Sequence, residues 1–395
     1  MTFDGAAITG DLDARVRQLL DTHHPAHTDP REFLIARFDA GLAWVQFPDG
    51  HGGLGVPQSF QERVNAALAA AGAPEPAVAK NGIGFGMAAP TIAAFGTEEQ
   101  KRKFLRPLFV GDDIYCQLFS EPGAGSDLAA VATRAVRHGD DWIVNGQKVW
   151  TSGAHNAQMA ILVARTDPNV PKHAGLTYFL CDMTDPGVEV RPLRQITGEA
   201  EFNEVFLTDV RVPDANRLGA EGQGWQVALT TLNNERVAIG SGAATAMIGK
   251  VAGAWRAQPE LRNPAMLDDL MRLWVEAEAM RLTGERLRQQ LASGQPGPEG
   301  SATKLAFARL AQAISGLEMQ LHSEAGLRYD DWTLRRPEIV DFIGRGPGYR
   351  YLRAKGNSIE GGTSEILRNV IAERVLGLPP EHRVDKDIAW KDLPQ

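Results

Sequence analysis

The chain has 395 residues, of which 43% are hydrophobic and 23% are charged, and its formal net charge is −8 at pH 7. This length allows roughly two or three domains, and the composition is that of a globular protein, which excludes a disordered or fibrous chain. The negative charge argues against a protein that coats nucleic acid or anionic membrane, because such binding depends on clustered lysine and arginine side chains.

Up to about residue 113 the sequence favours helices, because apolar residues recur at spacings of three and four. A loop interrupts this pattern at residues 47–57, where four glycines and two prolines prevent a helix. Residues 1–11 lack the basic and apolar segments of a signal peptide, so we expect a cytoplasmic protein.

From about residue 114 to 220 the pattern changes to short strands bounded by turn residues. The dipeptide Asn145-Gly146 favours a two-residue hairpin turn, because both turn positions need a positive φ. No helical pattern separates the strands, which indicates a small antiparallel barrel or sandwich. The only cysteines, Cys116 and Cys181, form neither a disulfide framework nor a CxxC metal site, and we expect no metal.

After residues 219–225 the helical pattern returns and continues almost to the end of the chain. The stretches 257–264 and 293–301 are rich in proline or glycine and predict connections between long helices. The most membrane-like run, 237–249, is too short and too weakly apolar to span a bilayer, so no membrane insertion is expected. The predicted order is helices, then a β module, then a helical bundle.

Glu235 is the first candidate for chemistry, because it is the one charged member of an otherwise apolar or small helix face. Burial of a carboxylate raises its pKa toward that of a useful general base. Pairing of Glu235 with a neighbouring cation is the alternative. The face consists of Trp225, Ala228, Leu232, Glu235, Ile239 and Ala243.

A second candidate lies in the stretch "SIEGGTSEI", residues 358–366. Gly361 and Gly362 allow the backbone to approach a ligand closely, with Glu360 at the edge of that approach. Thr363 is expected to cap the following helix. Both interpretations are compatible, because the bare N–H groups of a helix start also suit a polarised ligand.

The stretch "QLFSEPGAGSD", residues 117–127, ends in a glycine-rich polar turn where the helices give way to strands. Alone, such a turn is usually a connection. Together with "WTSGAHNA", residues 150–157, it offers an aromatic face and hydroxyl groups suited to a flat heteroaromatic cofactor. No GxGxxG pattern stands between a predicted strand and a predicted helix, and the sequence has no P-loop or GxSxG pattern, so nicotinamide, P-loop and α/β-hydrolase chemistry lack support.

These stretches together resemble the acyl-CoA dehydrogenase family of flavoproteins. The matching segments, in family order, are "FPDGHGGLG", "FGTEEQKRKFLRPL", "SEPGAGSD", "NGQKVWTSGA", "FLTDVRVP" with "GAEGQGW", and "IEGGTSEILRNVIAERVLG". The resemblance implies an N-terminal α-helical domain (1–113), an antiparallel β-barrel domain (114–220) and a C-terminal four-helix bundle (221–395). It also implies FAD, an acyl-CoA substrate in fatty acid β-oxidation or other lipid metabolism, an electron-transferring flavoprotein as acceptor, and a homotetramer.

The resemblance also implies roles for individual residues. Gln117, Phe119 and Ser120 contact the isoalloxazine of FAD, and Trp150 and Ser152 lie beside the flavin ring and its N5 edge. Gly125 lets the turn lie against the flavin and pantetheine, and Ser126 is near FAD and the CoA arm. Further implied contacts are Thr363 with the cofactor and Met87 to Thr91 with the acyl group.

The family places its catalytic base at either of two chain positions. One immediately precedes a Gly-Thr pair and is occupied here by Gly361, so the other position, Glu235 followed by Arg236, is the expected base. Glu360 is the alternative base. Arg236, Glu360 and Gly361 are expected near the substrate, and the backbone N–H near Gly361 and a ribityl hydroxyl of FAD are expected to stabilise the enolate-like oxygen.

Two family stretches are replaced in this chain, by "WRAQPELRNPAML" (255–267) and "LHSEAGLRYDDW" (321–332), so no residues are assigned to the adenine and pyrophosphate of FAD. A homodimer or a heteromer therefore stands beside the homotetramer. Two rival functions are a flavin-dependent oxidase or monooxygenase on the same fold, and a non-catalytic subunit of a heteromeric dehydrogenase. The length and branching of the acyl group are left open.

Overall fold

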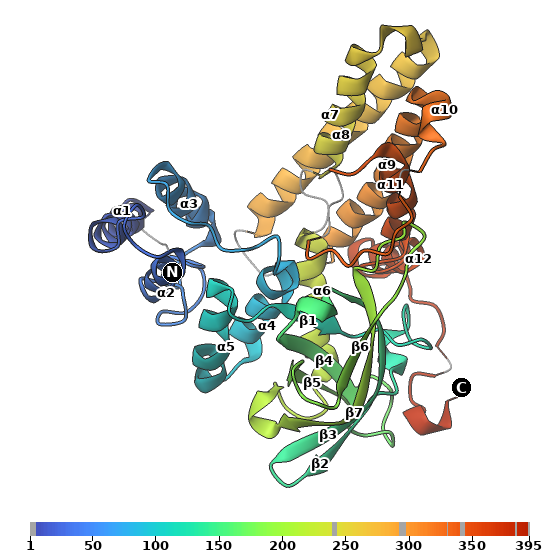
Figure 1. Cartoon of the computed structure of the whole chain (residues 1–395). Coiled ribbons are helices and arrows are strands. Elements are labelled where there is room, and N and C mark those ends of the chain that lie inside the picture. Colours follow the sequence, from blue (N-terminus) through green and yellow to red (C-terminus); the bar gives the residue numbers. More distant parts are fainter. Residues whose placement is uncertain are drawn as a thin grey trace.

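The computed structural model describes residues 5–238, 243–291, 298–329, 331–339, 344–383 and 385–393. Helices form both ends of the chain and an eight-stranded sheet lies between them (Figure 1), which confirms the predicted order. The N-terminal helices are α1 (Gly5–Thr22), α2 (Pro30–Asp39), α3 (Gln61–Ala70), α4 (Ala89–Phe95) and α5 (Glu98–Val110).

Local sequence signals explain where these helices begin and end. The side chain of Asp29 accepts hydrogen bonds from two backbone N–H groups in the first turn of α2. Thr97 and Gln100 form a reciprocal capping box at the start of α5. The same helix ends at Gly111, whose φ of 88° lies in the left-handed region that glycine adopts readily.

The β module is a mainly antiparallel sheet with the strand order β6-β7-β3-β2-β4-β5-β8. Its first strand, β1, pairs with β4 in parallel, and β2 touches β4 through one parallel pair. The strands are β1 (Tyr115–Leu118), β2 (Arg134–His138), β3 (Asp141–Ser152), β4 (Met159–Arg165), β5 (Leu176–Asp182), β6 (Val188–Pro192), β7 (Phe202–Pro213) and β8 (Arg217–Leu218).

The predicted hairpin turn at Asn145-Gly146 is wrong, because β3 runs through both residues and pairs with β2 and β7. The chain reverses instead between β2 and β3, where Gly139 has a φ of 65°. Gly146 serves a different need. A Cβ atom at this position would lie 2.4 Å from Oγ1 of Thr133, so only glycine permits this close approach.

The C-terminal helices are α6 (Gly224–Ala238), α7 (Ala243–Ala257), α8 (Pro264–Leu291), α9 (Gly300–Leu321), α10 (Ser323–Gly326), α11 (Pro347–Ala354) and α12 (Ser364–Val370). Helices α7, α8 and α9 pack against one another and extend away from the sheet, while α11 and α12 pack on α9 (Figure 1). Helix α6 contacts β5, α4 and α9, so it lies where the three regions meet.

The end of the chain returns to the β module (Figure 1). Ala389 bridges to Pro171, and the backbone N–H of Trp390 donates to the carbonyl oxygen of Val170 at 2.9 Å. The end of the chain therefore contacts the β module.

The domain limits 1–113, 114–220 and 221–395 stay a prediction. None of the helices in the described ranges is long and apolar enough to cross a membrane.

Candidate active site

The glycine-rich turn is anchored at its first carboxylate, Glu121, by Lys148 of β3. The ammonium of Lys148 is fully buried and donates to Glu121 Oε1 at 2.8 Å and to the carbonyl oxygens of Phe119 and Val163, both at 2.9 Å. Burial opposes the charged form of Glu121, but Lys148 and the N–H groups that bind its carboxylate outweigh burial and hold its pKa below the ordinary value.

The second carboxylate of the turn, Asp127, is anchored by Lys172. Its Oδ2 lies 2.6 Å from Nζ of Lys172, and the same ammonium lies 2.6 Å from Oδ2 of Asp385. Between the two anchored ends, Gly125 and Ser126 are exposed, and a Cβ atom at Gly125 would meet open space. The tip of the turn is therefore accessible to a ligand while both of its ends are held.

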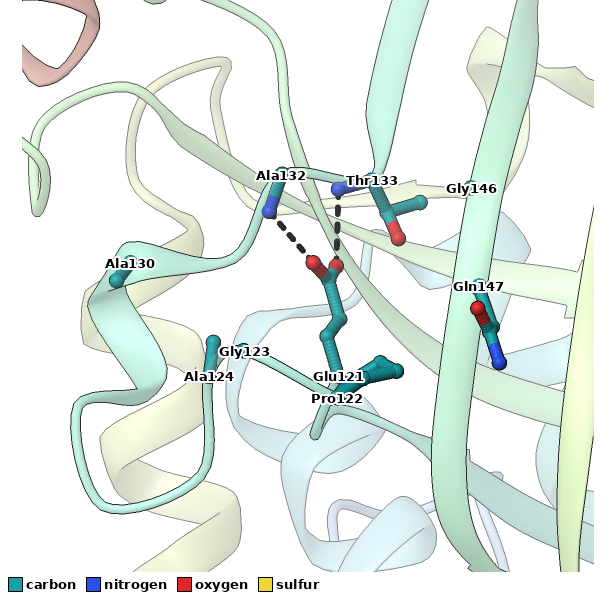
Figure 2. A pocket seen from close by; sticks show the side chains of 9 residues that line it. All are labelled: Glu121, Pro122, Gly123, Ala124, Ala130, Ala132, Thr133, Gly146 and Gln147. Atoms are coloured by element: carbon teal, nitrogen blue, oxygen red, sulfur yellow. Dashed lines mark hydrogen bonds between the residues drawn. The ribbon is translucent and has the colours of Figure 1, made fainter. Parts of the chain in front are cut away.

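Behind the turn lies a cavity of about 270 Å³ (Figure 2). The carboxylate of Glu121 accepts from the backbone N–H groups of Ala132 and Thr133, at 2.7 and 2.9 Å. Oγ1 of Thr133 is buried without a hydrogen-bond partner. The cavity is lined by Glu121, Pro122, Gly123, Ala124, Ala130, Ala132, Thr133, Gly146 and Gln147.

Trp150 presents a large apolar ring to solvent from a strained backbone. Its side chain is 58% exposed and its φ is 61°, which is rare for a bulky residue. The irregularity between Lys148 and Thr151 in the β3–β7 pairing produces this conformation, and the indole meets the ring of Phe202 edge-on at 5.7 Å. Such strain clusters at ligand sites, where the surrounding structure maintains it.

Three of the predicted flavin contacts come to this region from the end of β1. The carbonyl oxygen of Ser120 accepts from the N–H of Val149 at 2.9 Å, which places Ser120 beside the strand that carries Trp150 and Ser152. Gln117 is half-buried on β1, whereas Phe119 is buried and packs edge-on against Tyr178 at 5.9 Å. The ring of Phe119 is therefore not presented to a ligand.

The residues of this region fit the flavin end of FAD. The exposed indole of Trp150 suits a flat ring, and the open Gly125-Ser126 tip allows close approach of a ligand to the backbone. Two residues of the replaced segment 321–332 contact the β module: Tyr329 donates to the carbonyl oxygen of Thr197 at 2.6 Å, and Arg194 donates to that of Trp332 at 2.7 Å.

The Gly361-Gly362 loop is held by charged side chains on both sides. Glu360 accepts from Arg353 at 3.1 and 2.8 Å and from Nδ2 of Asn357 at 2.6 Å. On the other side, the buried ammonium of Lys304 donates to the carbonyl oxygens of Asn357 and Gly362, at 2.8 and 2.7 Å. The predicted helix cap is also present: Oγ1 of Thr363 accepts from the backbone N–H of Ile366 at 3.2 Å.

Arg353 connects this loop to the β module. Its Nε lies 3.3 Å from Oε1 of Glu201, a buried residue just before β7. Burial raises the pKa of Glu201 above the ordinary range. Burial alone would lower the pKa of Arg353, but Glu360 and Glu201 together hold it above the ordinary value.

The predicted acyl-pocket residues Met87 and Thr91 are buried against α6. Oγ1 of Thr91 lies 2.9 Å from Oγ1 of Thr231, which in turn lies 2.9 Å from the hydroxyl of Tyr178. These three hydroxyl groups join α4, α6 and β5. Thr91 also donates to the carbonyl oxygen of Met87 at 2.7 Å.

Glu235 follows Thr231 by one helical turn on α6. The side chains of Glu235 and Arg236 lie outside the described residues, so their roles stay predictions. The predicted apolar face of α6 is partly confirmed: Ala228 is buried, Trp225 and Leu232 are half-buried, and Ile239 lies outside the described residues.

The buried cations that position these loops could not be recognised from the sequence. Nothing in the sequence around Lys148, which lies in the matched segment "NGQKVWTSGA", or around Arg353 and Lys304 marks these residues as buried, and their partners lie far away along the chain. A buried lysine looks the same in sequence as an exposed one. Position on the inward-facing side of a strand is the one hint that Lys148 offers.

Three family models match consecutive parts of the chain. They describe the N-terminal, middle and C-terminal domains of acyl-CoA dehydrogenase and match residues 11–112, 116–210 and 222–376. Acyl-CoA dehydrogenase IpdE1 of Mycobacterium tuberculosis is 37% identical over 361 residues, which cover 91% of this chain and 90% of IpdE1. Acyl-CoA dehydrogenase FadE34 of the same organism is 43% identical over 347 residues, 87% of this chain, but this chain spans 46% of the length of FadE34.

Solved structures show the same similarity. The Tcur3481-Tcur3483 steroid ACAD superposes with a TM-score of 0.71 at 28% identity, and the match covers 96% of this chain and 100% of that chain. A glutaryl-CoA dehydrogenase from Mycobacterium smegmatis in complex with FADH2 gives a TM-score of 0.68 at 25% identity, covering 94% of this chain and 95% of that one.

Proposed function

Because the chain belongs to the acyl-CoA dehydrogenase family, we propose that it converts an acyl-CoA thioester to the trans-2-enoyl thioester. It is an oxidoreductase of this type, and FAD is its cofactor. In the proposed reaction the α-carbon loses a proton and the β-carbon loses a hydride, so that a double bond forms between them. Bound FAD supplies the acceptor for the hydride, and an electron-transferring flavoprotein takes the electrons afterwards.

In this proposal Glu235 removes the α-proton. The α-hydrogen of a thioester is weakly acidic, so its removal needs a carboxylate shielded from water and donors for the developing charge on the thioester oxygen. Helix α6 positions residue 235 one turn beyond Thr231, which hydrogen bonds fix to α4 and β5. The backbone N–H of Gly361 is the proposed donor to the thioester oxygen, and Arg236 is proposed to serve the substrate or the surroundings of the base.

The observation that supports Glu235 over Glu360 is the state of the Glu360 carboxylate. Both of its oxygens already accept hydrogen bonds: Oε1 accepts from Arg353 and Asn357, and Oε2 accepts from Arg353. A carboxylate that abstracts a proton must have an oxygen within hydrogen-bond reach of the substrate. These hydrogen bonds occupy the Glu360 carboxylate, and this favours a base on α6.

Anaerobic titration of the FAD-loaded protein with straight-chain, branched and steroid-side-chain acyl-CoA thioesters tests the function. We expect at least one thioester to bleach the flavin absorbance, and the reduced protein to be reoxidised by an electron-transferring flavoprotein much faster than by air. Rapid reoxidation in air without bleaching by any thioester supports an oxidase or monooxygenase instead. A protein that cannot be loaded with FAD, either by itself or together with candidate partner chains, supports a non-catalytic subunit.

The assembly is part of the proposal. Tyr329 and Trp332 of segment 321–332 contact the β module of their own chain, and neither this segment nor segment 255–267 carries the family's residues for the adenine end of FAD. We therefore propose an oligomer in which a second chain completes the site, as a homotetramer, a homodimer or a heteromer. Light scattering of the protein with and without FAD, and with candidate partner chains, measures which assembly holds the cofactor.

A further inference from the structure

We infer that Glu201, Arg353 and Glu360 form a clamp that positions the Gly361-Gly362 loop relative to the β module. This inference rests on the proposed function, because it gives the loop a task in substrate binding. The clamp joins three separate parts of the chain: the segment before β7, helix α11 and the loop before α12. In this role Glu360 is a positioning residue, not the base.

The loop needs such a clamp because its backbone is intrinsically loose. Gly361 has a φ of 62° and Gly362 a φ of 91°, both in the left-handed region, and glycine also populates many other conformations. Ile359, two residues before Gly361, is 68% exposed and provides no buried anchor. The N–H groups of two successive glycines are aimed at a ligand only if the ends of the loop are fixed.

Glu360 fixes one end of the loop with three hydrogen bonds. Nη1 and Nη2 of Arg353 contact both carboxylate oxygens, at 3.1 and 2.8 Å, and Asn357 adds a bond of 2.6 Å to Oε1. Such bidentate pairing restrains the orientation of the carboxylate as well as its distance. The carbonyl oxygen of Gly362, at the other end of the loop, accepts from Lys304 at 2.7 Å.

Arg353 extends this restraint toward Trp150, a proposed flavin contact. Its side chain is buried, its Nε faces Glu201 at 3.3 Å, and its guanidinium lies 5.6 Å from the centre of the Phe202 ring. Phe202 in turn contacts Trp150 edge-on at 5.7 Å. A single guanidinium therefore connects the loop, through Phe202, to the exposed indole of Trp150.

An apolar contact would hold the two parts together as well, but less specifically. Buried ion pairs contribute little net stability compared with apolar residues of similar size, because both charges lose their hydration. What the clamp adds is a fixed direction and distance. This favours a role in positioning the loop over a role in stabilising the fold.

Hydrogen–deuterium exchange of the FAD-loaded full chain tests the clamp without reference to activity. We expect Glu360→Ala and Arg353→Met each to speed exchange of the backbone amides in residues 359–366 by about tenfold to a hundredfold, while exchange in α9 stays unchanged. The double variant should exchange no faster than the faster single variant, since both remove the same restraint. Unchanged exchange in both single variants, or additive effects in the double variant, would overturn the inference.

Glu360→Ala keeps the test valid even if Arg353→Met fails to fold, because the change is at a partly exposed position and leaves the buried Arg353–Glu201 pair in place. The matched control is Arg368→Met. It removes an exposed arginine that pairs with Glu365 on α12, and it should change neither exchange nor turnover.

Turnover separates positioning from direct catalysis. With the thioester that bleaches the wild-type flavin fastest, Glu360→Gln should retain turnover within about tenfold, because its amide oxygen can still accept from Arg353. Glu360→Ala and Arg353→Met should lower kcat to a similar extent. If Glu360→Gln abolishes turnover while Arg353→Met does not, Glu360 is the base and the inference fails. If no thioester bleaches the flavin although the exchange result holds, the clamp stands and the proposed function fails.

Discussion

Lys148 and Lys304 are both fully buried lysines whose ammonium groups hold loops of the candidate site. Each donates to backbone carbonyl oxygens, and Lys148 also pairs with Glu121. A buried ammonium depends on its acceptors for stability, because it cannot be hydrated by water inside the protein. Substitution of Lys148 or of its partner Glu121 tests this dependence.

Replacement of Lys148 by methionine should destabilise the fold by about 3–5 kcal/mol, because it leaves Glu121 buried without its cation and removes a donor from two carbonyl oxygens. Urea unfolding at pH 7 measures this change. The control is Lys80→Met, which removes an exposed lysine whose Nζ lies 2.6 Å from Oε2 of Glu338. The distance resembles the 2.8 Å between Lys148 and Glu121, but the loss should cost at most about 1 kcal/mol because the pair is exposed. Equal effects of the two substitutions would contradict the structural role of Lys148.

The pH dependence of the pair has a definite sign. The pKa of Glu121 is lower in the folded protein than its usual value of 4.5, so its contribution to stability is present above about pH 4.5 and is lost as the pH falls. Glu121→Gln should therefore destabilise the protein at neutral pH, and its deficit relative to wild type should shrink as the pH falls below about 4.5. Urea unfolding at a series of pH values measures the deficit, and a deficit that stays constant would argue against the charged pair.

At the scale of the elements, local signals predicted what local physics decides. The Thr363 cap lies where the sequence predicts it, because the side chain and the N–H group that it binds are three residues apart. The Thr97 capping box, found in the structure, depends on the same short spacing. The Asn145-Gly146 hairpin failed for the opposite reason. Pairing of β3 with β7 both before and after residue 145 outweighs the turn preference of two residues, and Gly146 is needed for contact with Thr133.

Gly146→Ala tests that contact. The added Cβ would lie 2.4 Å from Oγ1 and 2.8 Å from Cα of Thr133, so β2 and β3 must separate, at a cost of about 1–3 kcal/mol. Gly284→Ala in α8 is the control, because it meets open space and should stabilise the helix slightly. Thermal unfolding of both variants measures the difference, and a Gly146→Ala variant as stable as wild type would show that the strands can adapt.

At the scale of the whole molecule, the sequence predicted the order of the three regions but not how they are joined. The joining contacts link residues far apart in the chain, such as Thr91 with Thr231 and Arg353 with Glu201. No periodicity or local spacing encodes such a pair. The position of the turn at residues 121–127 and of the Gly361-Gly362 loop could be predicted from sequence, whereas the side chains that hold them in place could not.

The C-terminal segment 385–393 makes contacts of this kind with the β module. Trp390 donates to the carbonyl oxygen of Ala130 at 3.2 Å and covers the guanidinium of Arg165 at 4.4 Å, while Asp385 shares Lys172 with Asp127 of the turn. We expect Trp390→Ala and Asp385→Asn to loosen the turn and to weaken FAD binding by roughly fivefold to tenfold.

Flavin fluorescence on titration of the apoprotein with FAD measures this affinity. Asp392→Asn is the control, since Asp392 is exposed on the same segment. If the control weakens FAD binding as much as the other two variants do, the segment has no specific role in holding the turn.

The central claim is that a carboxylate on α6 removes the α-proton of an acyl-CoA thioester. This step is measured directly by incubation of the thioester with the FAD-loaded protein in D₂O. Mass spectrometry of the thioester then reports how fast deuterium replaces its α-hydrogen. We predict that Glu235→Gln slows exchange by roughly 10²–10⁴-fold while FAD and thioester binding persist, and that Glu360→Gln retains exchange near the wild-type rate. Exchange that survives in Glu235→Gln and disappears in Glu360→Gln would contradict the claim.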